Sequence, residues 1–310
     1  MIQFPVLPML ATSAQPFDSP EHLYEVKWDG VRALAAVTAD RWQVWGRERA
    51  DYTARYPELE VLRRLPAGTI VDGELIVLRD GLPDLPAILR RHPLVRPDQI
   101  RHASRLDPVR YMLFDLLAWR GRSLLGEPLS CRRAALAELG AGLTESVFAI
   151  SEGVIGAGKD FFARVVQQGH EGVVAKHLAS VYHPGKRSSA WRKIKPVHIL
   201  PCVIIGYTAG PQGMDSLVVA AVWDGCLRYA ATLKRGLGRL ATELARRLAS
   251  LARAQPIVPC PGTAVWVDPV QYCQVRFRSR MRDGRLQDAV FVSFLESEPA
   301  ANRQRNRRRP

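Results

Sequence analysis

The stretch Glu25-Val26-Lys27-Trp28-Asp29-Gly30-Val31-Arg32 decides how this chain is interpreted. A lysine nitrogen can act as a nucleophile, and a glycine lets the backbone pass close to a phosphate. An arginine offers a planar set of donors for phosphate oxygens. The pattern therefore predicts that Lys27 holds a nucleotide. A strand that ends in an ordinary Asp-Gly turn is the alternative that this short stretch leaves open.

The composition predicts a globular protein with room for two domains. Of the 310 residues, 47% are hydrophobic and 24% are charged. No apolar run approaches the roughly 20 residues of a membrane span, and the first eight residues have no basic region, so we expect neither a membrane segment nor a secretion signal. Five scattered cysteines form no C-x-x-C pair. They favour a reduced, cytoplasmic protein without a structural zinc or a disulfide framework.

A strong excess of basic residues indicates a phosphate polyanion as partner. The net charge is +14, and the last segment, 303–309, holds five arginines and no acid. Subtracting these five leaves +9, so the rest of the chain is basic as well. An arginine-rich, solvated surface without a binding role is the alternative explanation.

The apolar pattern predicts a first domain, 1–198, that mixes strands and helices. A helix opens at Tyr56-Pro57, with Leu59, Leu62 and Leu65 as its apolar stripe. Ser130 is expected to cap a helix that runs to Leu139. The remaining expected elements are strands within 21–46 and at 69–78, 111–117 and 172–175, a helix with loops at 80–108, and a helix at 160–168.

After Pro196 the apolar segments become short and β-like, and this change predicts a second domain at 199–300. One helix, at about 240–252, interrupts them. Several strands and one helix suit a small barrel such as an OB-fold, although periodicity alone does not select it. A basic tail follows at 301–310. The expected strands are 202–207, 217–223, 227–233, 264–267, 272–277 and 290–294.

Six polar clusters follow one another along the chain: Lys27-Trp28-Asp29-Gly30-Val31-Arg32, Gly46-Arg47-Glu48-Arg49, Asp72-Gly73-Glu74, Phe114-Asp115, Glu171-Gly172-Val173-Val174-Ala175-Lys176, and Trp191-Arg192-Lys193-Ile194-Lys195. The series resembles the motifs of ATP-dependent DNA ligases, in the family's order. It is most similar to the small bacterial ligases and to the ligase domain of bacterial end-joining ligases. The resemblance covers about residues 6–294 and includes phrases such as Tyr182-His183-Pro184-Gly185-Lys186-Arg187.

The resemblance implies an α+β fold. A nucleotidyltransferase (adenylation) domain with antiparallel sheets and helices would be followed by a small β-barrel OB-fold domain. It also implies three chemical steps. Lys27 takes AMP from ATP, AMP moves to the 5′-phosphate of a nick, and the 3′-hydroxyl displaces AMP. The implied substrate is nicked duplex DNA, the cofactors are ATP and Mg²⁺ or Mn²⁺, and a Ku-like end-joining protein is a candidate partner of the monomer.

Roles for single residues follow from the same resemblance. Lys27 is the catalytic residue, and nearby cations would favour its uncharged, nucleophilic amine. Lys193 and Lys195 would hold the α-phosphate, with a basic sheet edge as the alternative. Glu171 and Glu74 would bind the metal, Glu74 also lying near the ribose, or would simply be solvated at strand ends. The remaining nucleotide-binding residues are Glu25 near the adenine, Arg32 and Arg47 at phosphates, and Phe114, which would stack on the adenine or belong to the core.

One family motif is missing. An R-x-D-K-like string near the end of the barrel is replaced by Val290-Phe291-Val292-Ser293-Phe294 and the acidic residues that follow. Because that motif orients pyrophosphate during self-adenylation, we consider Arg276, Arg278, Arg280 and Arg282 as substitutes. Two other functions remain open: an RNA ligase or capping-type nucleotidyltransferase, and a non-catalytic nucleic-acid-binding relic.

Overall fold

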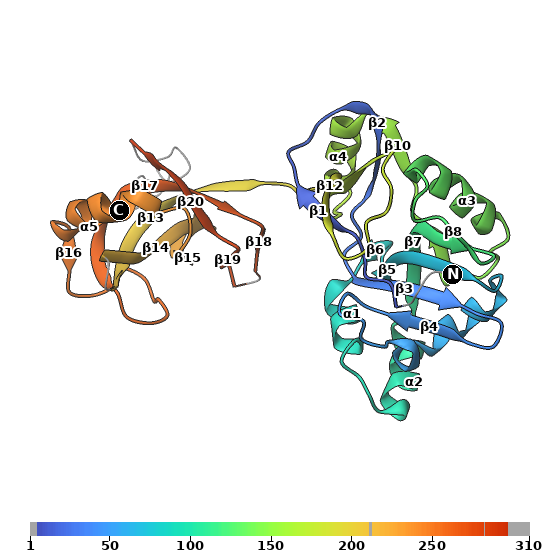
Figure 1. The fold of residues 1–310 in the computed structure, drawn as a ribbon. Helices are drawn as coiled ribbons and strands as arrows, with labels where there is room; N and C mark the ends of the chain where they lie inside the picture. Colours follow the sequence, from blue (N-terminus) through green and yellow to red (C-terminus); the bar gives the residue numbers. More distant parts are fainter. Residues whose placement is uncertain (1–4, 211–212, 282, 297–310) are drawn as a thin grey trace. The chain divides into compact units, whose positions relative to one another are not determined.

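The lysine stretch joins two β-sheets (Figure 1). In the computed structural model, which describes residues 5–210, 213–281 and 283–296, β2 (Ser19–Val26) ends just before Lys27 and β3 (Val31–Val37) begins just after Gly30. β2 belongs to a five-stranded sheet and β3 to a seven-stranded sheet. The Asp-Gly turn is therefore a crossing between two sheets and not a hairpin turn.

The chain divides into two compact units, Met1–Lys195 and Pro196–Pro310. In the first unit the five-stranded sheet has the order β1-β12-β11-β2-β10. α4 (Gly158–Gln167) packs Val165 against Tyr24, Val173 and Ile194 of this sheet. The other strands are β1 (Leu10–Ser13), β10 (Gly153–Gly156), β11 (Val173–His177) and β12 (Arg187–Ile194).

The seven-stranded sheet has the order β4-β3-β5-β7-β8, with β6 paired to β5 and β9 paired to β7. Antiparallel pairing was expected and holds for most pairs, but β1 runs parallel to β12 and β9 parallel to β7. The strands are β4 (Trp42–Trp45), β5 (Thr69–Arg79), β6 (Leu82–Pro83), β7 (Val109–Trp119), β8 (Arg122–Ser123) and β9 (Phe148–Ile150).

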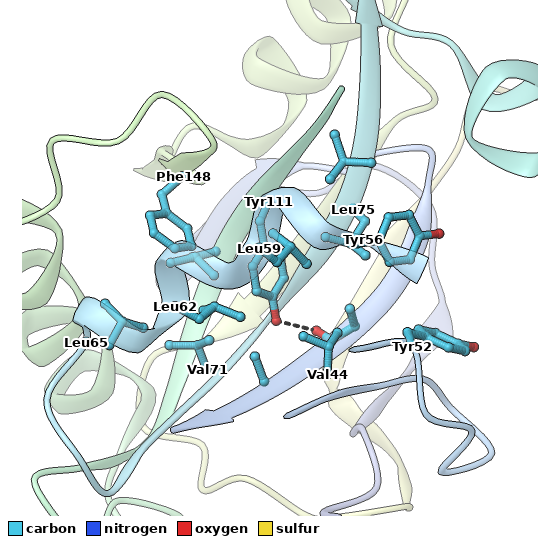
Figure 2. Packing of buried hydrophobic residues seen from close by; sticks show 14 of the residues in the cluster. Val44, Tyr52, Tyr56, Leu59, Leu62, Leu65, Val71, Leu75, Tyr111 and Phe148 are labelled. Atoms are coloured by element: carbon cyan, nitrogen blue, oxygen red, sulfur yellow. Dashed lines mark hydrogen bonds between the residues drawn. The ribbon is translucent and has the colours of Figure 1, made fainter. Parts of the chain in front are cut away.

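A short helix covers the seven-stranded sheet. The helix expected from Tyr56-Pro57 is present as η2 (Pro57–Arg64), a 3-10 helix with proline in its first turn. Leu59, Leu62 and Leu65 recur every third residue, which is the period of a 3-10 helix, and all three are buried. Figure 2 shows them packed near Val71 and Tyr111.

Three more helical elements lie between β4 and β7: η1 (Thr53–Arg55), α1 (Leu85–Arg91) and α2 (Pro97–Leu106). The expected single helix with loops at 80–108 is thus a pair of short helices. Pro97 lies in the first turn of α2, where a missing N–H costs nothing. The side chain of Asp84 accepts a hydrogen bond from the Ala87 amide and so caps α1.

The expected cap at Ser130 is wrong. α3 (Leu129–Ala141) already includes Ser130, and its first amides are satisfied by the backbone of a distant loop. The amide of Leu129 donates to the carbonyl of Ser180, and that of Ser130 donates to the carbonyl of Leu178. A tertiary contact therefore replaces the side-chain cap that the local sequence suggested.

The second unit contains a sheet of order β15-β14-β13-β17-β16, with β20 paired to β17. Two strands expected at 264–267 and 272–277 are one strand, β17, with a register shift opposite Ile204/Gly206 of β13. The elements are β13 (His198–Gly210), β14 (Gly213–Trp223), β15 (Cys226–Leu233), η3 (Gly238–Leu240), α5 (Ala241–Ala249), β16 (Ala252–Arg253), β17 (Val265–Phe277), β18 (Ser279–Arg280), β19 (Leu286–Gln287) and β20 (Val290–Leu295).

All five cysteines are free. Cys202 and Cys273 are buried partners on β13 and β17, whereas Cys131 on α3 and Cys226 on β15 are exposed. Burial raises the pKa of the Cys202, Cys260 and Cys273 thiols. In the described part of the chain, none of the helices has the length and apolar character needed to cross a bilayer. The expected basic tail, 301–310, lies outside the described residues.

Candidate active site

A cavity of about 400 Å³ lies in the first unit and is lined by residues of both sheets. This size is typical of a small-ligand site. Seven of its lining residues are Lys or Arg and two are Glu, so the cavity suits an anion. The charged lining residues are Glu25, Lys27, Arg32, Arg47, Glu74, Lys176, Arg187, Lys193 and Lys195, and the aromatic ones are Trp28, Phe114 and Trp191.

Lys27 lies directly after β2, and its amide donates to the carbonyl of Gly172 at 2.9 Å. Gly172 has φ +141°, and a Cβ on it would lie 2.2 Å from the carbonyl oxygen of Ile194. Only glycine suits this position, because any larger residue would push the neighbouring strand away. Gly172 thus lets the chain just before β11 pass close to the end of β12. The Gly172 carbonyl binds the Lys27 amide, so this close approach places Lys27 beside Glu171, the residue that precedes Gly172.

The ammonium group of Lys27 forms an ion pair with the carboxylate of Glu171. The same carboxylate pairs with Lys195, so it lies between two of the expected site lysines. Nearby cations were expected to favour the uncharged amine of Lys27. The structure adds this paired carboxylate to the cations that surround Lys27. Lys27 remains 22% exposed and faces the cavity.

Asp29 and Glu171 form a crowded pair of carboxylates. Burial, and then the charge of Glu171, raises the pKa of Asp29. Burial alone would raise the pKa of Glu171, but the charge of Lys27 and hydrogen bonds from Lys195 and Lys27 lower it. Across the described residues no three His, Cys, Asp or Glu side chains gather to hold a metal ion. Two crowded carboxylates nevertheless fit Mg²⁺, which is commonly bound by one or two carboxylates together with substrate phosphates.

Lys193 lies on β12 in a strongly cationic part of the cavity. Burial, and then the charges of Arg187, Lys195 and Lys27, lowers the pKa of Lys193. Such repulsion is relieved when an anion enters between the cations. Both Lys193 and Lys195 line the cavity, as expected from their alternation along the strand.

Glu25 is a buried carboxylate held by two cations. It is 1% exposed and forms ion pairs with Lys176 and, at 3.0 Å, with Arg133. Arg133 also donates to the carbonyls of Phe114 at 3.2 Å and Ser151 at 2.6 Å. Burial lowers the pKa of Lys176, against the opposing charge of Glu25. Sequence analysis missed Lys176, although it ends one of the six clusters, and missed Arg133, which no local pattern marks.

Arg32 on β3 is held by Asp72 on β5. Two hydrogen bonds of 2.6 Å join the guanidinium group to the carboxylate. Asp72 is fully buried and lies in the Asp72-Gly73-Glu74 cluster, where sequence analysis gave a role to Glu74 alone. The guanidinium carbon of Arg32 lies 4.5 Å from the centroid of the Phe114 ring. A bidentate pair of this kind fixes the orientation of the guanidinium group of Arg32.

Phe114 belongs to the core and also reaches the cavity, so its stacking on the adenine stays a prediction. It is 8% exposed, packs with Leu117, Tyr182 and Trp191 in a buried cluster, and also lines the cavity. The ammonium nitrogen of Lys176 lies 4.2 Å from its ring centroid. Phe114 is therefore a core residue with part of its side chain accessible from the cavity.

Glu74 and Arg47 complete the predicted set that lines the cavity. Burial raises the pKa of Glu74 to about 7, against the lowering charges of Arg32, Lys27 and Arg47. Arg47 follows β4 in an exposed turn. Eight of the predicted residues, all except Glu171, line one cavity, and Glu171 joins them through Lys27 and Lys195.

The arginines considered as substitutes for the missing motif belong to the second unit. Arg276 is an exposed residue of β17, Arg278 forms an ion pair with Asp288 at 3.6 Å, and Arg280 lies 4.6 Å from the ring centroid of Trp223. Arg282 lies outside the described residues.

The chain matches the family model described as "ATP dependent DNA ligase domain" over residues 8–195. The multifunctional non-homologous end joining protein LigD of Pseudomonas aeruginosa is 31% identical over 315 residues, which cover 95% of this chain and 36% of that protein. The LigD protein of Mycobacterium tuberculosis is 32% identical over 300 residues, which cover 91% of this chain and 37% of that protein. The chain thus spans a little over a third of the length of these relatives.

Two solved structures of ligase domains are similar to this chain as well. A mycobacterial DNA ligase D complexed with ATP and MES is 28% identical, with a TM-score of 0.57, 96% of this chain and 97% of that chain covered. The ligase domain of M. tuberculosis LigD gives the same identity and TM-score, with coverages of 95% and 96%. These matches define the class, a nucleotidyltransferase-type ligase domain built mostly of sheet with a few helices. The chain belongs to the family of ATP-dependent DNA ligase domains.

Proposed function

We propose that this protein is an ATP-dependent DNA ligase that seals 5′-phosphate/3′-hydroxyl breaks in duplex DNA through a covalent lysyl-AMP intermediate. The observation that carries the proposal is the position of Lys27. Its nitrogen faces a cavity lined by six further cations, beside a buried ring and a buried carboxylate. A nucleophile, a phosphate-binding set and a base-binding wall thus lie around one space.

In the first step, the Lys27 nitrogen attacks the α-phosphorus of ATP. A P–N bond forms, the bond to pyrophosphate breaks, and AMP remains attached as a phosphoramidate. Lys193 and Lys195 neutralise the α-phosphate, and Arg32 and Arg47 neutralise further phosphate oxygens. Glu25 and Phe114 hold the adenine, and Glu74 contacts the ribose. Incoming phosphates compete for the two lysines that Glu171 now pairs, so Glu171 releases Lys27 when ATP enters.

The next two steps transfer AMP and seal the break. An oxygen of the DNA 5′-phosphate attacks the phosphorus of lysyl-AMP, the P–N bond breaks, and the lysine amine is restored. The 3′-hydroxyl of the break then attacks the activated 5′-phosphorus, and AMP leaves with the bridging oxygen. The protein positions the groups and neutralises charge.

Glu171, with Asp29 beside it and Glu74 across the cavity, would hold Mg²⁺ or Mn²⁺. The metal would supply charge neutralisation at the triphosphate. Asp29 is an addition to the predicted ligands, and it is supported by its closeness to Glu171, whose charge, after burial, raises the pKa of Asp29.

The division of the chain supports a two-domain enzyme. We assign adenylation to residues 1–198 and an OB-like barrel to 199–300, because the second unit has a curled sheet of short and long strands with one α-helix against it. The basic composition suits duplex DNA as substrate. The relatives are named as end-joining proteins, which makes a Ku-like protein a candidate partner.

A nick-sealing assay tests the function. The protein is incubated with ATP, Mg²⁺ and a singly nicked duplex, and Lys27→Ala serves as the inactive control. We expect sealed DNA and an AMP adduct with wild type, and neither with the variant. GTP in place of ATP, and nicked RNA in place of DNA, distinguish a capping-type enzyme and an RNA ligase. Absence of any adduct on wild type would leave the non-catalytic binding protein as the better explanation.

A further inference from the structure

The hydroxyl group of Tyr182 closes a ring of hydrogen bonds beside the cavity. The Met9 amide donates to the Tyr182 oxygen at 2.9 Å, and the hydroxyl donates to Asp72 Oδ2 at 2.7 Å. Asp72 holds Arg32 through its two bonds of 2.6 Å. Arg32 Nη2 then donates to the Met9 carbonyl at 3.4 Å, which returns the ring to its start.

Every member of this ring except Arg32 is almost fully buried: Tyr182 is 3% exposed, and Met9 and Asp72 are 0% exposed. The proton positions are fixed by chemistry. An amide can only donate, so the Tyr182 oxygen accepts from Met9 and its single hydrogen is left for the carboxylate. Buried polar groups are costly when unpaired, so the arrangement resists distortion.

The ring connects two walls of the cavity. Met9 and Arg32 both line the cavity, whereas Asp72 and Tyr182 do not. The segment around Met9 has further links to the loop after Tyr182. The Gly185 amide donates to the Leu7 carbonyl at 3.2 Å, and the Leu10 amide donates to the Lys186 carbonyl at 2.9 Å. The wall formed by residues 7–11 is thus attached to the loop that carries Tyr182.

We propose that Tyr182 is a positioning residue for the nucleotide. Through Asp72 it orients the guanidinium group of Arg32, and through Met9 it fixes the wall 7–11 at the width that ATP requires. It touches no substrate atom itself. This inference rests on the proposed function, because it concerns the loading of AMP onto Lys27.

The test is Tyr182→Phe, which removes only the hydroxyl. AMP loading is followed with labelled ATP over a range of ATP concentrations. We expect the half-saturating ATP concentration to rise by about tenfold, with little change in the maximal rate, because a buried, charge-assisted hydrogen bond is lost from the binding wall and Lys27 is untouched.

Tyr56→Phe is the matched control. Tyr56 is also fully buried, and its hydroxyl forms a 2.9 Å hydrogen bond with Nδ1 of His92, away from the cavity. Both variants lose a buried hydrogen bond and should melt at a lower temperature. Only Tyr182→Phe should change the half-saturating ATP concentration, so a general loss of stability cannot produce the result.

Coupling to Arg32 provides the second readout. In an Arg32→Ala background, the effect of Tyr182→Phe should be smaller, because one of the two groups that Tyr182 positions is gone. An unchanged half-saturating concentration in Tyr182→Phe, or an undiminished effect in the Arg32→Ala background, overturns the inference. If Tyr182→Phe does not fold, Asp72→Asn takes its place, since it retains the shape and removes the orienting charge. A wild-type protein without any AMP adduct overturns the proposed function itself.

Discussion

The carboxylate of Glu171 is in direct ion-pair contact with the ammonium nitrogen of Lys27. The proposed nucleophile is therefore paired with an acid that lies 144 positions away in the sequence. Because Lys195 shares the same carboxylate, one acid balances two of the cations that line the cavity. A ligand that brings its own negative charge would compete with Glu171 for both lysines.

Glu171→Gln should lower the rate of AMP loading by about 100-fold or more, because the orienting charge and a proposed metal ligand are lost together. The rate is measured at saturating ATP and Mg²⁺. Glu21→Gln is the control, since Glu21 is 71% exposed and pairs with His177 outside the cavity. Loading by Glu171→Gln at the wild-type rate would show that Lys27 needs no help from this acid.

Breaking the buried ion pair of Arg132 with Asp115 on one side should be strongly destabilising. Both side chains are 0% exposed, and Arg132 Nη1 also donates to the carbonyls of Glu127 and Ser180. Arg132→Met should lower the free energy of unfolding by about 3–5 kcal/mol, because it leaves a buried carboxylate unpaired. The double variant Arg132→Met, Asp115→Leu should recover part of this loss. Denaturant midpoints check both.

A surface pair provides the comparison for that experiment. Arg122 is 74% exposed in its ion pair with Glu127. Arg122→Met should change the free energy of unfolding by less than about 1 kcal/mol. Equal losses at Arg122 and Arg132 would contradict the importance of burial.

Gly30 is required by packing between strands. A Cβ on Gly30 would lie 2.2 Å from the carbonyl oxygen of Leu75 and 2.8 Å from Cγ2 of Ile76. Gly30→Ala should therefore destabilise the fold by about 1–3 kcal/mol. Gly126→Ala, where nothing lies within 4 Å of the added carbon, should leave the melting temperature almost unchanged. Equal melting temperatures for the two variants would rule out the steric explanation.

His92 should make stability depend on pH. Burial, and then the charge of Arg55, lowers the pKa of His92 below its ordinary value of 6.5. The unfolded chain therefore binds the proton more readily, so the contribution of neutral His92 is present above about pH 6.5 and is lost as the pH falls toward the folded pKa. His92→Gln should flatten the fall in melting temperature between about pH 7.5 and 5.5. His102→Gln, at an exposed position of α2, should retain the wild-type slope.

The sequence predicted the elements that carry strong local patterns. Strands rich in apolar and β-branched or aromatic residues, such as 69–78 and 111–117, are present within β5 and β7. The errors came from tertiary contacts. Ser130 lost its expected cap because carbonyls of 178 and 180 satisfy the helix, and β17 remains one strand because β13 pairs with it on both sides of an irregularity.

The same contrast between local patterns and tertiary contacts applies to the residues of the candidate site. Charged residues in short clusters could be proposed one by one from the family resemblance, and the cavity brings seven of them together with Phe114. Their partners could not be found in this way. Arg133 and Tyr182 contact residues that lie 18 and 110 positions away, Ser151 and Asp72, and no sequence periodicity records such a contact. Sequence patterns show which groups are charged, whereas only the fold shows which group orients another.

The distribution of the cysteines has a practical consequence. Cys131 is exposed on α3 of the first unit and Cys226 is exposed on β15 of the second, whereas burial raises the thiol pKa of the other three cysteines. Maleimide dyes should therefore react first at these two native positions. Energy transfer between the dyes would then report the distance between the two units during each step of the proposed reaction. No engineered cysteine would be needed.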